Sequence, residues 1–427
     1  MPPIDDHPLR YALANELHAR PFPAFDAPCH AIFLAVKQPI DAAGRDRDAD
    51  RRHLLALLDR NGAAHPPPDA THFFGDLGQH RLKWESHTEF VTYTALCSGL
   101  TDRAFDPALF DVFPENWLAS APGNRITSVL LRVEFMPQDE REIEDKLAQW
   151  FVPESLACSR VLDGDAIIAC DFRIDPAGHT RIVAFVRPET GARRIGRIIQ
   201  RLCEIETYKS MSMLGLARAR KLAPRMGTLD MQLSALVGDM TSADRSPEET
   251  LHKLLAISSE LENLLVRSSF RFGATGAYEA IVNQRIEVLR EERYKGRQTF
   301  GEFMMRRFDP AMRTTKSAER RLNLMAERSV RAAELLRTRV DVERSAQNQR
   351  LLESMDRRAD LQLRLQHTVE GLSVVAISYY AVSLAAYMAY PLAEPLGLSK
   401  GAMTAALTPV VVLAVWMMIR RIKRHIG

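Results

Sequence analysis

The sequence lacks the short motifs that mark the common enzyme classes. Its 427 residues contain no G-x-x-x-x-G-K-[ST] phosphate loop, no G-x-G-x-x-G dinucleotide loop, no G-x-S-x-G nucleophile elbow and no H-E-x-x-H zinc motif. Eight of the twelve histidines precede Thr88, and their spacing matches no common metal site. We therefore expect a protein that is not an enzyme and that needs no cofactor.

Cysteine is scarce and the net charge is small. The five cysteines are dispersed without a C-x-x-C pair, which is typical of reduced thiols in the cytoplasm rather than of disulfides or a zinc site. A net charge of +3 is too small to indicate nucleic acid as a partner. Residues 1–17 contain no apolar stretch, so no signal peptide is expected.

Long apolar runs are missing from most of the chain and gather near its C-terminus. Residues 369–390 carry one charge, Glu370, at their edge, and residues 402–419 carry none. Each run has about the 20 residues that a helix needs to cross a bilayer. The connection between them is short and holds two prolines and two glycines. We predict that residues 369–427 form a two-helix transmembrane hairpin with a basic cytoplasmic tail.

Basic residues lie at the two ends of this hairpin, which face the same side of the membrane. They precede the first run and follow the second, at Arg357, Arg358, Arg364, Arg420, Arg421, Lys423 and Arg424. The connection has a single lysine. The positive-inside rule then predicts a multi-pass protein of the cytoplasmic membrane with both termini in the cytoplasm and the lipid bilayer as a partner.

A long helical stalk is predicted for residues 311–368, which contain no proline or glycine. As one helix this segment is about 87 Å long. Apolar or small residues recur at near-heptad spacing early and late, with a polar middle between them: Leu322, Ala326, Ser329, Ala333, Leu336 and Val340, and then Leu361, Leu365 and Leu372. We expect the stalk to pack against neighbours at both ends and the protein to be a homo-oligomer.

Residues 1–188 have the pattern of an α+β cytoplasmic domain. Strands are predicted at 31–37, 72–77, 81–96, 126–136, 161–173 and 180–187, and helices at 47–60 and 139–151. The order strand, helix, strand, strand occurs twice, with glycine-bearing turns at 76–79 and 175–178. We infer a duplicated strand–helix–hairpin unit that forms a mainly antiparallel sheet.

Strand signals end after Pro188, and residues 189–310 are predicted to form a helical domain. Its helices are expected to break at Pro224, at Ser246-Pro247 and at 273–276, where Gly273 and Gly276 occur. One helix is expected to cover 278–308.

Four stretches of the chain resemble one bacterial family of uncharacterised membrane-anchored proteins, classed as a domain of unknown function. They are Glu16-Leu17-His18-Ala19-Arg20-Pro21-Phe22, Glu85-Ser86-His87-Thr88-Glu89-Phe90, Glu206-Thr207-Tyr208 and Thr368-Val369-Glu370-Gly371-Leu372-Ser373. The resemblance spans essentially the whole chain. It implies the cytoplasmic (inner) membrane of a bacterium and supplies no activity.

A weaker resemblance is architectural. A cytoplasmic domain, a long helix and a C-terminal hairpin are similar to the CorA-type magnesium transporters, which are homopentamers. Their Gly-Met-Asn signature is missing, because the matching stretch is Tyr387-Met388-Ala389-Tyr390-Pro391. This difference puts magnesium selectivity in doubt.

Two candidate sites lie in or beside the first membrane helix. A polar stripe at helical spacing consists of Ser373, Tyr380, Ser383, Tyr387 and Tyr390. It indicates either helix–helix contacts or the lining of a hydrated pore. At the membrane boundary, either His367 and Glu370 form a cation- or proton-sensing pair at a pore mouth, or Glu370 only reaches interfacial water or pairs with arginines of the stalk.

Two further candidate sites lie in the N-terminal domain. Alternation along the strand 81–96 places Glu85, His87 and Glu89 on one face, either as ligands of a divalent ion or as an exposed polar surface. Glu16, His18 and Arg20 form a polar loop in which Arg20 either binds a phosphate or carboxylate or pairs within the fold. For the Glu85, His87 and Glu89 cluster, the sequence identifies no fourth metal ligand.

Three functions are compatible with these patterns. The first is a non-enzymatic membrane-anchored sensor or scaffold, with a small ligand or ion left open as a partner. The second is a CorA-like homo-oligomeric channel or transporter with the first membrane helix lining the pore. The third is a membrane-tethered enzyme with its site near His18 and Arg20.

Overall fold

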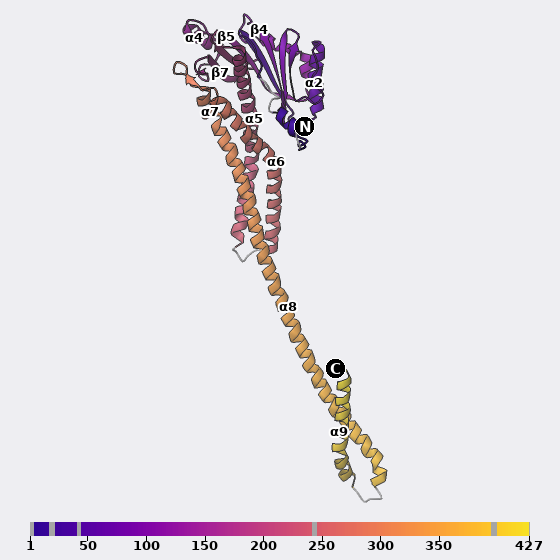
Figure 1. Ribbon diagram of the computed structural model, residues 1–427. Helices are drawn as coiled ribbons and strands as arrows, with labels where there is room; N and C mark the ends of the chain where they lie inside the picture. Colours follow the sequence, from indigo (N-terminus) through magenta and orange to yellow (C-terminus); the bar gives the residue numbers. More distant parts are fainter. Residues whose placement is uncertain (1–3, 17–21, 41–43, 241–245, 394–398, 427) are drawn as a thin grey trace. The chain divides into compact units, whose positions relative to one another are not determined.

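The computed structural model describes residues 4–16, 22–40, 44–240, 246–393 and 399–426, and the statements below concern these residues. The chain divides into two compact units (Figure 1). One comprises Met1–Ala243 and His252–Ala332, and the other comprises Asp244–Leu251 and Ala333–Gly427.

The first unit contains a sheet with the strand order β2-β3-β4-β1-β5-β8-β7-β6-β9 in its described part. The strands are β1 (Cys29–Lys37), β2 (His72–Leu77), β3 (His80–Ser86), β4 (Phe90–Ser98), β5 (Asn124–Phe135), β6 (Ala157–Val161), β7 (Ala166–Ile174), β8 (Thr180–Val186) and β9 (Glu292–Arg293). Short helices accompany them: α1 (Arg10–Glu16), α2 (Arg47–Arg60), η2 (Pro107–Val112), α3 (Glu115–Ala119) and α4 (Glu140–Trp150).

The sheet is mixed, and the expectation of a mainly antiparallel sheet needs correction. β1 pairs antiparallel with β4 and with β5, whereas β5 pairs parallel with β8. The order β-α-β-β recurs, as β1-α2-β2-β3 and β5-α4-β6-β7, but the two runs differ in strand direction. Hairpin turns fix only the strands that they join, so local turn signals did not predict the parallel pair.

Two predicted strands are in fact strand pairs. The predicted strand 81–96 is divided between β3 and β4, and 161–173 is divided between β6 and β7. The second break has left-handed backbone at Leu162, Asp163 and Gly164, with φ of 55°, 62° and 87°. A strand cannot continue through three such residues.

Both faces of β1 are buried, and its alternate residues enter two cores. Ala31 and Phe33 belong to the core that includes Ile198 of the next helix, α5 (Ala192–Asp239). Ile32 and Leu34 belong to the core that includes the leucines of α2 and Leu147 of α4. The sheet is therefore covered by α5 on one face and by α2 and α4 on the other.

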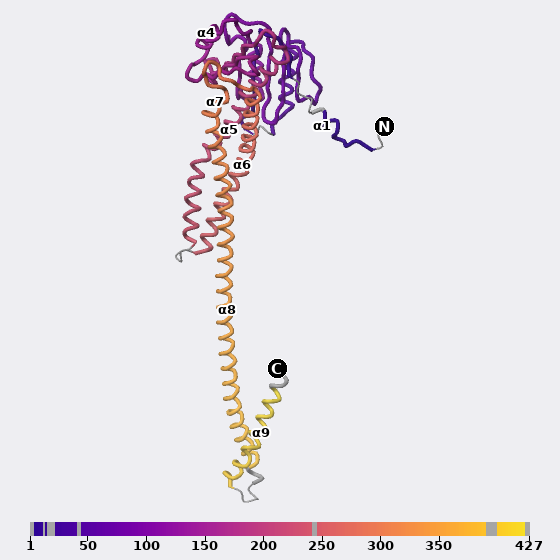
Figure 2. The backbone as a smooth tube through the Cα atoms, turned by 60° about the vertical axis from the view of Figure 1, so that its left-hand side comes forward, coloured from indigo at the N-terminus to yellow at the C-terminus, as the bar shows by residue number. Residues whose placement is uncertain are grey.

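Long helices follow the sheet. They are α5, α6 (Pro247–Glu287), α7 (Phe300–Arg307), α8 (Asp309–Ala393) and α9 (Lys400–Ile426). Within the first unit α5, α6 and the start of α8 lie side by side (Figures 1 and 2). Ion pairs cross between them, from Arg225 to Glu260 at 2.5 Å and from Arg321 to Asp230 at 2.7 Å.

Several helix boundaries differ from the expected ones. α5 continues through Pro224, and α6 continues through Gly273 and Gly276. A proline inside a helix costs about 3 kcal/mol, which burial of the surrounding apolar side chains in this bundle offsets. The expected single helix 278–308 is wrong, because α6 ends at Glu287 and β9 and α7 follow.

The stalk and the first apolar run form one helix, α8, as the lack of helix breakers predicted. The near-heptad residues Leu322 to Val340 form an early seam of this helix, and Leu361, Leu365 and Leu372 form a late seam. The early seam is buried at Leu322, Ser329 and Leu336, so these positions are not open to other copies of the chain. The late seam is exposed, with Leu361 at 65% and Leu365 at 67% of full exposure.

Two stretches, one in α8 and one in α9, are long and apolar enough to cross a membrane. Only 6% of each stretch is buried. They therefore differ from the core helices of soluble proteins, which are mostly buried.

Candidate functional site

The turn between β3 and β4 is the centre of the candidate site. Arg45 is buried and donates hydrogen bonds to the carbonyl oxygens of His87 at 2.6 Å and Phe90 at 3.3 Å, and to that of Thr88. Its Nε pairs with Asp50 Oδ2 at 2.6 Å. The arginine thus satisfies the hydrogen-bonding capacity of the carbonyl groups in a turn that contains neither glycine nor proline.

Glu89 projects from this turn and is fully buried. Its carboxylate accepts hydrogen bonds from both Nη atoms of Arg271 and, at 2.9 Å, from the Tyr278 hydroxyl. Lys37 Nζ lies 3.9 Å away. Burial, with a further contribution from Arg271, lowers the pKa of Lys37. The Glu89 carboxylate is therefore the shared counter-ion of Arg271 and Lys37.

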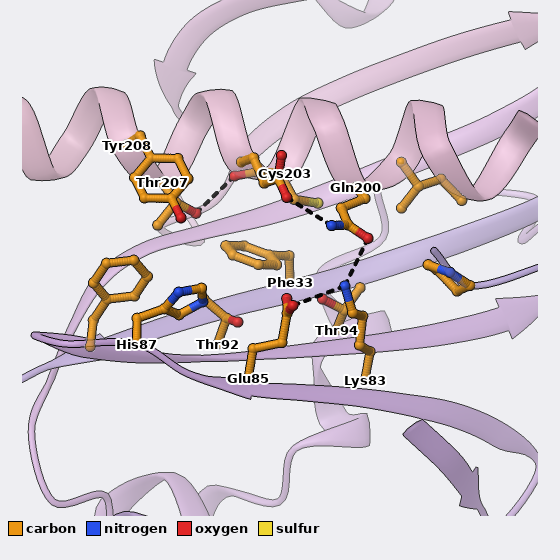
Figure 3. Close-up of a pocket in the computed structure, with 14 residues that line it drawn as sticks. Phe33, Lys83, Glu85, His87, Thr92, Thr94, Gln200, Cys203, Thr207 and Tyr208 are labelled. Carbon is orange, nitrogen blue, oxygen red and sulfur yellow. Dashed lines mark hydrogen bonds and ion pairs between the residues drawn. The ribbon is translucent and has the colours of Figure 1, made fainter. Parts of the chain in front are cut away.

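Glu85 and His87 line a different space, a small cavity between the sheet and α5 (Figure 3). Lys83 Nζ lies 3.1 Å from the Glu85 carboxylate and donates to Gln200 at 2.7 Å. Gln200 donates to Glu204 at 2.7 Å. The cavity volume is about 30 Å³, enough for one or two water molecules and too small for a metabolite.

Aromatic rings surround His87. Its imidazole stacks on Phe90 with 4.4 Å between centroids and meets the edge of Tyr208. Tyr208 in turn stacks on Tyr278 at 5.4 Å. Figure 3 shows Tyr208 and His87 on opposite sides of the cavity.

The structure does not place Glu85, His87 and Glu89 on one strand face. β3 ends at Ser86, so His87 and Glu89 belong to the turn, and Glu89 points to Arg271 instead of to the cavity. Among the described residues, no three His, Cys, Asp or Glu side chains gather in a way that could hold a metal ion. The ligand hypothesis for these three residues therefore has no geometric basis.

Glu206 belongs to one of the stretches that resemble the family, but the sequence did not indicate its contacts. It is buried on α5 and accepts hydrogen bonds from the Thr127 hydroxyl at 3.3 Å, the Thr180 hydroxyl at 3.5 Å and Lys209 at 2.7 Å. These contacts attach α5 to the two strands that pair in parallel. No local signal reveals them, because the partners come from segments far apart in the chain.

The predicted loop of Glu16, His18 and Arg20 lies outside the described side chains. α1 ends at Glu16, whose side chain is not described, and His18 and Arg20 are outside the described residues. Their role stays a prediction.

Part of the predicted polar stripe gathers against α9. Ser383 and Tyr387 line a cavity of about 320 Å³ together with Lys400 and Thr404. The Ser373 hydroxyl donates to the Val369 carbonyl at 2.8 Å, within its own helix. Tyr380 is exposed, and the side chain of Tyr390 lies outside the described residues.

The expected pairing of His367 with Glu370 is present. His367 Nδ1 lies 3.7 Å from Glu370 Oε2, and Gln366 Nε2 donates to Glu370 Oε1 at 3.3 Å. The pair is local to one turn of α8 and has the geometry of an ordinary i, i+3 contact.

Comparison with known proteins gives one family. No curated protein matches the chain. The resemblance to CorA-type transporters receives no support from these comparisons. A model of a family described as "Protein of unknown function (DUF3422)" matches residues 5–426. The chain belongs to this family, DUF3422.

Proposed function

We propose that this protein is anchored in the cytoplasmic membrane of a bacterium by α8 and α9 and that its large body is a non-enzymatic sensor or scaffold in the cytoplasm. The observation that carries the proposal is the exposure of the two apolar stretches, of which only 6% is buried. Exposed apolar surface costs about 25 cal/mol per Å² in water, and a bilayer removes that cost.

The flanks of the hairpin support an orientation with both termini inside. Arg420 lies over the Trp416 ring at 4.9 Å, and this pair occupies the end of the α9 apolar stretch. Tryptophan and arginine are characteristic of the membrane interface, with arginine enriched on the cytoplasmic side. The membrane segment then comprises 369–390 and 402–419, with a sheet domain 1–188, a helical domain 189–310 and a stalk 311–368 before it.

A scaffold or sensor role for the body is supported by the polar junction at the β3–β4 turn. The cavity of about 30 Å³ admits no organic substrate. The surrounding polar contacts instead connect the sheet with both long helices, since Lys83 of β3 donates to Gln200 of α5 and Glu89 of the β3–β4 turn pairs with Arg271 of α6. These contacts connect the turn physically to both helices, and we propose that a change at one helix reaches the turn through them, as a sensor or scaffold requires.

Cysteine labelling tests the anchor. All five native cysteines are buried, so a membrane-impermeant maleimide should not react with them in the folded protein. We expect Lys400→Cys to be labelled in intact spheroplasts, and Arg420→Cys only after the membrane is permeabilised. Labelling of Arg420→Cys in intact spheroplasts overturns the orientation. Recovery of the wild-type chain in the soluble fraction overturns the anchor.

A further inference from the structure

An open groove with strong positive charge lies in the first unit, where the end of β1 and the start of β5 meet α5 and α6. Its volume is about 730 Å³. Six cationic side chains line it: Lys37, Arg125, Arg218, Lys221, Arg267 and Arg271. Among the described residues that line the groove, none is Asp or Glu.

The buried and half-buried cations of the groove share very little negative charge. Lys37 and Arg271 both depend on the single carboxylate of Glu89. Arg218 pairs with no carboxylate in the described part of the chain and donates to the Ser268 hydroxyl, at 3.0 and 3.1 Å, and to the Arg267 carbonyl at 3.4 Å. The base of the groove therefore keeps an excess of positive charge.

The rim adds three cations with unused hydrogen-bonding capacity. The side chains of Arg125, Lys221 and Arg267 form no ion pair or hydrogen bond with any described residue. Arg125 packs over Gly178, where a Cβ atom would lie 2.5 Å from its Nη2. The missing side chain at Gly178 leaves room for the guanidinium in this position.

A second arginine-rich groove of the same unit differs because carboxylates pair with some of its arginines. It is lined by arginines of α5 and by Arg290, but Arg194 pairs with Asp165, and Arg290 pairs with Asp163 at 2.7 Å. Two of the four arginines in this second groove are thus paired with carboxylates of the chain, and Glu287 also lines it, in contrast to the groove at the β1–β5 end of the sheet.

We propose that the groove at the β1–β5 end binds a small ligand that carries phosphate groups on an organic body. Guanidinium groups form paired hydrogen bonds with phosphate oxygens, and several unpaired cations favour more than one anionic oxygen group. The volume is within the range of small-molecule sites. Ile40, Ile126 and Leu214 supply an apolar wall for the organic part. The inference goes beyond the proposed anchor and does not depend on it.

Titration calorimetry on the full chain in detergent tests this site. The probes are inorganic pyrophosphate and dihexanoyl phosphatidic acid, with dihexanoyl phosphatidylcholine for comparison. We expect at least one phosphate probe to bind, with an affinity that falls as sodium chloride is raised. The double variant Lys221→Gln/Arg267→Gln should lose about tenfold in affinity or more.

A matched control separates local contacts from net charge. Arg220→Gln/Arg313→Gln removes the same charge from exposed positions of α5 and α8 that do not line the groove. It should change the affinity by less than about twofold, a few tenths of a kcal/mol, as expected for screened charges outside the site. Both double variants should keep the melting temperature and membrane association of the wild type.

Each outcome decides the proposal. Tighter binding of pyrophosphate favours a soluble phosphate compound as the ligand, and tighter binding of phosphatidic acid favours a lipid headgroup. Both results support a phosphate site. The proposal is overturned if neither probe binds, if phosphatidylcholine binds equally well, or if the two double variants lose equal affinity. None of these results bears on the membrane anchor, which is tested separately by whether the wild-type chain is recovered in the membrane or the soluble fraction.

Discussion

The buried carboxylate of Glu89 is held by Arg271, a residue 182 positions later in the chain. The pair joins the β3–β4 turn to α6, and Arg271 is at the same time part of the basic groove. Because Lys37 shares this carboxylate, the turn stabilises two cations that would otherwise repel each other. The same contact thus stabilises the fold and holds two cations of the groove in place.

Replacing Glu89 with Gln should destabilise the protein strongly. The change leaves Lys37 and Arg271 without their buried counter-charge, and removing one partner of a buried pair costs about 3–5 kcal/mol. Urea unfolding followed by circular dichroism measures the loss. Glu327→Gln is the control, because its pair with Arg331 is exposed and should contribute less than about 1 kcal/mol. Equal losses in the two variants would contradict the role of Glu89.

Elements with strong local signals could be predicted from the sequence. α2 covers 47–60 and β2 covers 72–77, the ranges that the sequence indicated. The Asp46 side chain caps α2 by accepting from two backbone N–H groups of its first turn, and the apolar residues of α2 have helical spacing. Local chemistry is sufficient in such cases.

The candidate site could not be predicted in the same way. The β3–β4 turn contains no glycine, proline or asparagine, so residues 81–96 resemble one uninterrupted strand. The turn exists because Arg45, more than forty positions earlier, satisfies its carbonyl groups. Likewise, α5 continues through Pro224 because of its tertiary packing. Interactions between distant segments decided both features, and a single sequence does not show them.

Gly215→Ala should destabilise the contact between α5 and α6. A Cβ atom at this position would lie 2.3 Å from Thr275 Oγ1, and Thr275 is buried, so one of the helices must shift. Overpacking of this kind costs about 1–3 kcal/mol.

Gly227→Ala is the control, because it lies on the same helix with no atom within 4 Å of the new Cβ. That change should stabilise the protein by up to about 1 kcal/mol, since alanine favours helix. Thermal unfolding compares the two variants. A gain in stability for both would show that the helices do not approach closely at Gly215.

Acid should weaken the fold through His30. Burial, followed by the positive charge of Arg132, lowers the pKa of His30 from 6.5 to about 4. Below pH 6.5 the unfolded chain therefore binds a proton at His30 that the folded chain does not, and the free energy of unfolding falls as the pH drops toward 4.

His30→Gln should reduce this fall by up to about 3 kcal/mol, as measured by urea unfolding from neutral pH to about pH 4. The exposed His65 provides the control, and His65→Gln should leave the slope near that of the wild type. An unchanged pH dependence in His30→Gln would exclude His30 as the source.

We propose that the expected homo-oligomer forms through the late seam of α8, since the early seam is already buried. Leu336→Asp would disturb the fold itself, because Leu336 is 1% exposed. Leu361 and Leu365, one helical turn apart and exposed, remain available for another copy of the chain. We predict that Leu361→Asp/Leu365→Asp lowers the mass of the detergent-solubilised protein to that of the monomer.

Native mass spectrometry measures this mass. The control Ser345→Asp/Gln349→Asp places the same charges at the same spacing in the exposed polar middle of the stalk, and it should leave the assembly intact. A wild-type protein that is monomeric at all concentrations would contradict the oligomer. A wild-type oligomer that survives the leucine changes would place its contact outside the late seam.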